Sequence, residues 1–184
     1  MDGSSTTNTF LSTHEEFALI QTFLKYASQV GFFMNISRFL SAVSNGESSA
    51  GGIGDALVQA VYLWGSHLSV SDVSRARAPS FLSRSLQEVS KSVPSIVTET
   101  SDYRVVQTIQ AEVLLSNYFF TTGRFLEGRY HSLAAVALVT GSRLHQLGSN
   151  MDPIMETTGN MESVTFGENV CAFWTVYTLD NCWL

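Results

Sequence analysis

The glycine run Gly51-Gly52-Ile53-Gly54 is the part of the sequence that comes closest to a phosphate-binding loop. Such loops aim backbone N–H groups at an anion where a helix begins. Here no predicted strand precedes the run and no Gly-Lys-Ser/Thr follows it, and the carboxylate of Asp55 would repel a phosphate. We therefore interpret the run as a linker.

His145 and Asp180 are the second candidate for chemistry. His145 falls at the end of one predicted helix and Asp180 inside an apolar one, so the two could form a buried charged or hydrogen-bonded pair across helices. A catalytic dyad would also need a positioned nucleophile, and the sequence contains no G-x-S-x-G elbow. Because buried polar groups are normally paired, we predict a structural role for both residues and no catalytic residue.

Cysteine and histidine positions argue against a metal site. Cys171 and Cys182 belong to one predicted helix and would lie about 16 Å apart along it, too far for a disulfide. The histidines are scattered through the chain, at His14, His67, His131 and His145. A four-ligand zinc site needs ligands at short spacing, so we expect no metal or other cofactor in this chain.

Aromatic residues at helical spacing could line a small-molecule cavity, but they more often fill a core because they contribute the most buried area. We predict core positions, and a cost of about 3–5 kcal/mol for Trp174→Ala. No Asp-rich pair such as DDxxD occurs, which disfavours an isoprenoid-type enzyme. No enzyme is predicted. The residues concerned are Trp64, Trp174, Tyr118, Phe119, Phe120, Tyr130 and Tyr177.

Composition limits the partners of the chain. A net charge of −6 with ten Lys and Arg argues against direct binding of DNA or RNA, and the group Arg75, Arg77 and Arg84 is interpreted as a solvated loop. A hydrophobic content of 45% with 14% charged residues suggests that some apolar surface needs a partner. The longest apolar run, residues 133–139, is too short to cross a bilayer, so no membrane association is expected.

The elements that would position these residues are helices. Apolar residues recur with helical period and nothing alternates with period two, so we predict an all-α fold of about seven helices in antiparallel pairs. Residues 1–13 are predicted to be a flexible Ser/Thr-rich tail, and residues 14–184 one helical domain. The predicted helices are 15–30, 33–43, 55–68, 79–91, 100–122, 124–147 and one from about 163. The first is expected to have Thr13 as its N-cap and Glu16 in the capping-box position.

The clearest pair of helices flanks Gly123. One apolar stripe holds Val106, Ile109, Val113 and Phe120, and the other holds Leu126, Tyr130, Leu133, Ala137 and Leu144. The short connection predicts antiparallel neighbours packed through these stripes. The cluster of Ala134, Ala135, Ala137 and Gly141 is expected to let the two backbones approach closely.

Five segments, in this order, resemble the middle homology region of fungal transcription factors with a zinc binuclear cluster. They are FLKYASQVGFFMNISRFL, AVYLWGSHLS, PSFL, IQAEVLLSNYFFTTGRFLEGRYHSLAAVALV and FWTVYTLD, and the resemblance runs from about Glu15 to the end. Three features depart from the family pattern. No cysteine cluster or basic linker precedes residue 15, Arg143 stands where the family commonly has glycine, and the domain is expected to be cut at Leu184.

The resemblance implies a helical regulatory domain of a nuclear protein that controls transcription by RNA polymerase II. In the family, zinc and DNA are bound by a separate six-cysteine module, so this chain would contact DNA only through that module. Transcriptional co-regulators, self-association and a small-molecule effector are the expected partners. We also expect the chain to be incomplete at its C-terminus, because the last helix stops without a cap. Its apolar residues Phe173, Trp174, Tyr177 and Trp183 would then favour dimerisation or aggregation.

A second interpretation is a stand-alone helical adaptor that binds protein partners, in the manner of helical repeat proteins. Only one good helix pair is visible in the sequence and no repeat period recurs, which makes this the weaker hypothesis.

Overall fold

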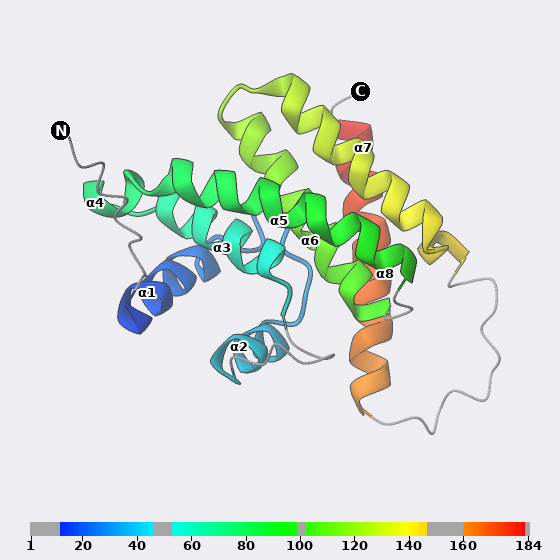
Figure 1. Ribbon diagram of the computed structural model, residues 1–184. Coiled ribbons are helices and arrows are strands. Elements are labelled where there is room, and N and C mark those ends of the chain that lie inside the picture. Colours follow the sequence, from blue (N-terminus) through cyan, green and yellow to red (C-terminus); the bar gives the residue numbers. More distant parts are fainter. Residues whose placement is uncertain (1–11, 46–52, 99–101, 147–159, 183–184) are drawn as a thin grey trace.

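The computed structural model describes residues 12–45, 53–98, 102–146 and 160–182, and every regular element in them is a helix (Figure 1). The all-α prediction is confirmed. The elements are α1 (Thr13–Leu24), α2 (Ile36–Asn45), α3 (Asp55–His67), the short α4 (Asp72–Arg75), α5 (Ala78–Thr98), α6 (Asp102–Thr121), α7 (Phe125–Gly141), the 3-10 turn η1 (Leu144–Gln146) and α8 (Asn160–Cys182). Residues 1–11 of the predicted tail and residues 46–52 of the glycine-rich linker lie outside the described residues. The tail prediction is wrong for Ser12 and Thr13, which are the N-cap and the first residue of α1.

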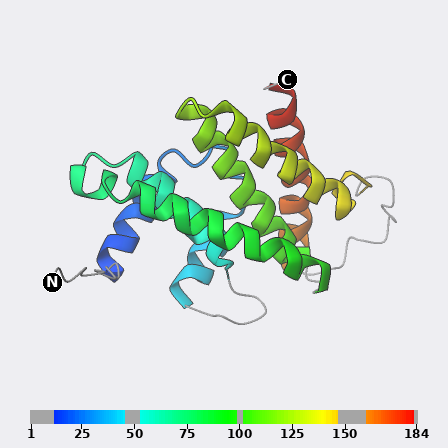
Figure 2. The same ribbon diagram turned by 45° about the horizontal axis from the view of Figure 1, so that its top comes forward.

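Helix α6 passes through the middle of the molecule, with α3 and α5 against one side and α7 and α8 against the other (Figures 1 and 2). From Val105 to Phe120 every residue of α6 is buried except Asn117, which is half-buried. Two hydrophobic clusters therefore share this helix. One joins it to α1, α3 and α5, and the other joins it to α7 and α8.

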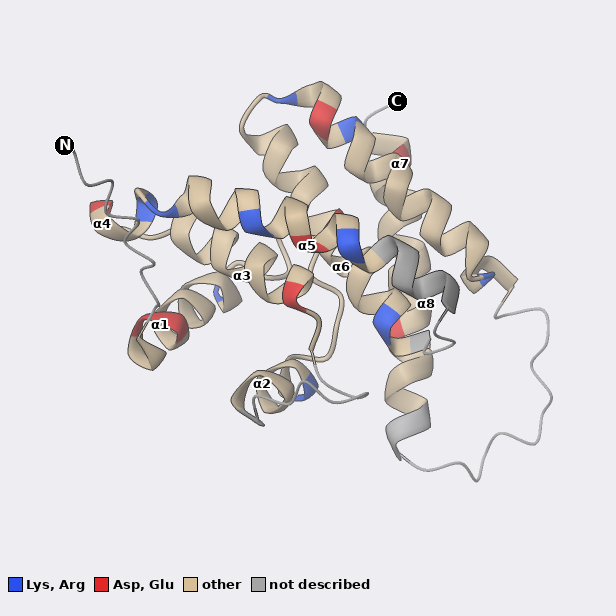
Figure 3. Cartoon of the chain, viewed as in Figure 1, with Lys and Arg blue, Asp and Glu red and all other residues tan. Residues whose placement is uncertain are grey.

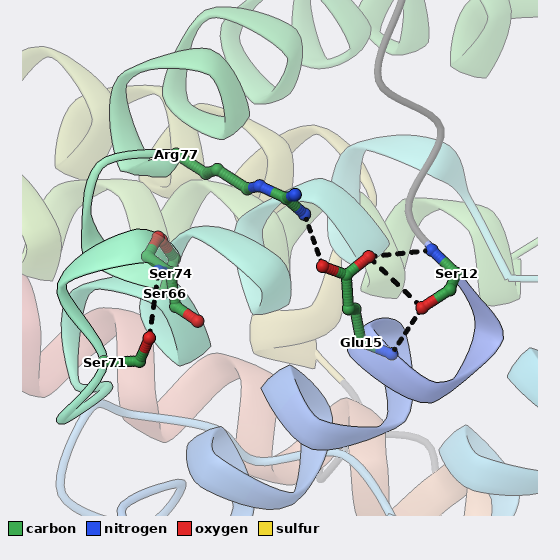
Figure 4. A network of polar contacts seen from close by, with 6 residues as sticks. All are labelled: Ser12, Glu15, Ser66, Ser71, Ser74 and Arg77. Atoms are coloured by element: carbon green, nitrogen blue, oxygen red, sulfur yellow. Dashed lines mark hydrogen bonds and ion pairs between the residues drawn. The ribbon is translucent and has the colours of Figure 1, made fainter.

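Helix α1 begins at Thr13, two residues before the predicted start, and its N-cap is one residue before the predicted one. Ser12, not Thr13, is the N-cap, and Glu15 completes a capping box in which each side chain bonds the backbone N–H of the other residue. The Glu15 carboxylate also lies 3.2 Å from Arg77, which ties the start of α1 to the segment before α5 (Figure 4). Nearby, Ser66 donates a hydrogen bond to the carbonyl oxygen of Ser74.

The connection between α1 and α2 is held by side chains of α6 and α8. The helix ends at Leu24, earlier than the predicted Val30, and turns lead to Gly31, where φ is +80°. The Gln110 side chain accepts from the backbone N–H of Phe33 (2.7 Å) and donates to the Gly31 carbonyl (3.0 Å). From α8, Glu168 accepts from the backbone N–H of Asn35 (2.9 Å). These bonds satisfy backbone groups that lie between the two helices.

Candidate interaction surface

Helix α7 presents its apolar stripe to solvent. Leu126 is 86% exposed, Tyr130 68% and Leu133 50%, and Ala137 is exposed as well. The prediction that this stripe packs against the preceding helix is wrong, although its last member, Leu144, is buried. We call Leu126, Tyr130, Leu133 and Ala137 the α7 stripe.

The face of α7 that packs against α6 is made of small and polar residues: Gly128, His131, Ser132, Ala135 and Val139. A Cβ atom at Gly128 would lie 2.6 Å from the Phe120 ring, so glycine is what allows the two helices to approach. Ser116 of α6 donates to the Gly128 carbonyl at 2.8 Å. Close packing therefore depends on Gly128 and not on Gly141, where an added Cβ would meet no described atom within 4 Å.

A buried polar pair lies inside this interface. Nδ1 of His131 is 2.6 Å from Oε2 of Glu112, and the two side chains are 6% and 2% exposed. The imidazole also stacks on Phe119, with ring centroids 5.3 Å apart. Leaving either polar group buried without its partner would cost free energy, so the pair favours this face of α7 as the inner one. This pair was not predicted from the sequence, in which Glu112 lies eleven residues before Gly123 and His131 eight residues after it, so no local pattern links them.

Helix α8 also carries exposed aromatic residues. Trp174 is 58% exposed and Tyr177 is 54% exposed, so the prediction that they belong to the core is wrong. Their rings contact one another at 5.8 Å between centroids, and Phe173 lies 5.1 Å from Trp174. The α8 residues that do enter the core are Ala172, Val176 and Leu179. Trp183 lies outside the described residues.

Asp180 pairs with Arg129, not with His145. Its Oδ1 atom lies 2.7 Å from Nη1 of Arg129, and both side chains are about a third exposed. His145 lies in η1 and is exposed. The predicted pair is therefore wrong, because α8 runs beside α7 in a register that places Asp180 near the start of α7.

This ion pair also joins the outward faces of the two helices. Residues three or four apart share a helix face, so Leu126 and Leu133 flank Arg129, and Tyr177 lies beside Asp180. Six of the eleven exposed large apolar side chains of the described residues belong to α7 and α8. We define the α7–α8 surface as the α7 stripe together with Trp174 and Tyr177.

The remaining aromatic predictions divide between core and surface. Trp64 is 3% exposed and its indole N–H donates to the Leu114 carbonyl at 2.9 Å, so its core assignment is confirmed. Tyr118, Phe119 and Phe120 are buried as predicted, whereas Tyr130 is not. Burial also lowers the pKa of His67, whose ring contacts Trp64 edge-on at 5.8 Å.

Within the described ranges, no three His, Cys, Asp or Glu side chains are grouped as metal ligands would be. The same ranges contain no helix with the length and apolar character that a bilayer span requires. Cys171 and Cys182 are free and exposed. Of the three arginines predicted to form a solvated loop, Arg75 pairs with Asp72 and Arg77 pairs with Glu15.

Comparison with known proteins finds no matching family model, no matching curated protein and no matching solved structure.

Proposed function

We propose that this chain is a helical regulatory domain that binds a protein partner through the α7–α8 surface, and that it belongs to a fungal zinc-cluster transcription factor. The observation that carries the interaction role is the outward apolar stripe of α7, with three large apolar side chains at least half exposed on one helix face. A partner that covered them would remove apolar surface from water, which is the main driving force of association.

The family assignment is supported by the order of the five sequence segments and by the backbone at Arg143. Arg143 has a φ of +57°, in the left-handed region that favours glycine. The resemblance places a glycine at this position. The backbone conformation at this position favours glycine, and the family commonly has glycine there, which supports the resemblance.

The proposed mechanism is conformational coupling. A partner, or a small-molecule effector bound between helices, would favour one of two states in which a separate activation segment is either hidden or free. Such coupling requires that the partner bind the two states with different affinity. In this proposal the protein acts in the nucleus, and zinc and DNA are bound by a separate six-cysteine module, since the net charge of −6 suits neither DNA nor RNA.

A reporter assay in a fungal host tests this function. The chain is placed between a heterologous DNA-binding module and an activation segment, and the output is compared with that of the same fusion without the chain. We expect the chain to change the output, and the variant Leu126→Asp/Leu133→Asp to abolish that change. The matched control is Val70→Asp, since Val70 is 94% exposed and lies outside the α7–α8 surface.

An unchanged output would contradict the regulatory role. If the chain leaves transcription unaffected but its α7–α8 surface still binds a protein, the stand-alone adaptor becomes the better interpretation. Equal effects of Val70→Asp and the double leucine variant would instead contradict the assignment of the function to this surface.

A further inference from the structure

The α7 stripe has the spacing of a coiled-coil seam. Its residues Leu126, Tyr130, Leu133 and Ala137 follow one another at intervals of four, three and four residues. Thr140 continues this spacing three residues further on, and all five residues are exposed. This is the alternation of d and a positions in a heptad repeat, and it gives a narrow seam suited to one facing helix. The natural occupant of the stripe is therefore another α-helix.

The stripe is free of charge along most of its length. No Asp, Glu, Lys or Arg occurs from Tyr130 to Ser142, and Figure 3 shows the charged residues of α7 confined to its first turns. Glu127 is already paired with Arg124, the residue before α7, and Arg129 is paired with Asp180. Two copies of a chain with a net charge of −6 can therefore meet at this stripe without placing like charges opposite each other.

The stripe is also complementary to itself when two copies run antiparallel. With a two-fold axis midway between positions 131 and 132, Leu126 of one copy faces Ala137 of the other, and Tyr130 faces Leu133. A large residue then meets a smaller one in every layer, as close packing requires. A parallel pair would place Ala137 opposite Ala137 and Tyr130 opposite Tyr130, which leaves one layer thin and another crowded.

The exposed apolar area of the α7–α8 surface is consistent with a dimer of moderate affinity. The five large side chains of the α7–α8 surface average somewhat over half exposed, and at about 200 Å² for a large side chain they offer roughly 600 Å² per copy. A standard interface buries about 800 Å² per partner. Together the α7 and α8 helices of two copies would bring four helices into contact, as in a four-helix bundle.

We propose that the α7–α8 surface binds a second copy of this chain, with the two α7 helices packed antiparallel about a two-fold axis. The inference rests on the proposed function, since it names the partner of the same surface. An interface at the small end of the size range is typical of weak, reversible association, so we expect a dissociation constant on the order of 10 μM.

Sedimentation equilibrium of the purified chain between about 1 and 200 μM tests the association, because that range spans the expected constant. We expect a reversible monomer–dimer equilibrium. Leu126→Asp/Leu133→Asp should raise the dissociation constant at least about 100-fold, because each copy loses two apolar contacts, while Val70→Asp should leave it unchanged. A monomer throughout the range, or an equal effect of Val70→Asp, would overturn the proposal. Circular dichroism confirms that each variant is folded.

Cysteine cross-linking tests the antiparallel register. The exposed Cys171 and Cys182 are first replaced by serine. In this background, Leu126→Cys/Ala137→Cys should form a covalent dimer on mild oxidation, because the two positions face each other across the axis. Each single variant should remain uncross-linked. Efficient cross-linking of Ala137→Cys alone would show a parallel pair and overturn the register.

The two proposals fail separately. A monomeric chain whose double leucine variant still alters reporter output has another partner at this surface, and only self-association is overturned. A dimer that leaves reporter output unchanged overturns the regulatory function and keeps the self-association.

Discussion

Helix α6 divides the molecule into two halves that use their apolar residues in opposite ways. On the side of α1, α3 and α5, large apolar side chains point inward, and Phe23, Leu57 and Phe39 are completely buried. On the side of α7 and α8, the contact between α6 and α7 contains glycine, serine and a Glu–His pair beside Ala135 and Val139, whereas Leu126, Tyr130 and Leu133 of α7 point outward. The first half buries its large apolar residues, and the second half leaves an apolar face exposed.

The largest expected effect is in the half that contains α1, α3 and α5, and it tests whether that half is the densely packed one. Phe23 is fully buried and its ring meets Phe32 edge-on at 5.2 Å. Phe23→Ala should lower the free energy of unfolding by about 3–5 kcal/mol, because it removes buried apolar area and leaves a cavity. Chemical denaturation measures the change. A loss below about 1 kcal/mol would mean that this half is not the densely packed one.

Gly65→Ala probes the contact between α1 and α3. A Cβ atom at Gly65 would lie 2.2 Å from the backbone carbonyl oxygen of Leu19, so α1 must move for an alanine to fit. We expect a loss of about 3 kcal/mol in the free energy of unfolding.

Gly167→Ala is the matched control for that substitution. Gly167 lies inside α8, where an added Cβ would meet no described atom within 4 Å. Alanine there should stabilise the chain by about 0.5–1 kcal/mol. If the two alanine variants had the same thermal midpoint, the close contact between α1 and α3 would be disproved.

His131→Ala probes the polar inner face of α7. The substitution leaves the carboxyl group of Glu112 buried without its hydrogen-bond partner, which should cost about 1–3 kcal/mol. Glu112→Gln/His131→Gln, which keeps a polar group on both sides, should recover part of the loss. Urea denaturation compares the variants, and a stability equal to that of the wild type for His131→Ala would show that the pair does not hold α7 in place.

Arg143→Gly should stabilise the chain. Its φ of +57° costs a side chain about 1 kcal/mol more than it costs glycine, and the side chain is exposed, so little contact is lost. We expect a gain of about 0.5–1 kcal/mol in the free energy of unfolding. A decrease on thermal denaturation would mean that the Arg143 side chain makes a stabilising contact.

The smallest expected effect is that of Trp174→Ala. Because Trp174 is 58% exposed, its removal should change the stability of the monomer by about 0.5 kcal/mol or less, in place of the 3–5 kcal/mol expected of a core residue. The measurement is made well below the dimer dissociation constant. A loss above about 2 kcal/mol would return Trp174 to the core and remove the contrast between the halves.

The helices could be predicted from the sequence, but many of the tertiary contacts between them could not. Helical period predicted the seven helices of ten residues or more in the described part of the chain, and the turn at Gly123, with a φ of +77°, separates α6 from α7 as expected. The side chains that hold the α1–α2 connection were missed. Gln110 and Glu168 bond backbone groups more than seventy positions away, and no local pattern marks such contacts.

The sequence by itself determined an all-helical chain and an antiparallel hairpin around Gly123, because apolar period and glycine act over a few neighbouring residues. Only the tertiary structure decided which face of α7 is buried. The apolar stripe and the face through Gly128 and His131 repeat with the same helical period, so the pattern cannot rank them. Close approach at Gly128 and the bond between Glu112 and His131 require two helices in contact, and these turn the apolar stripe to the surface.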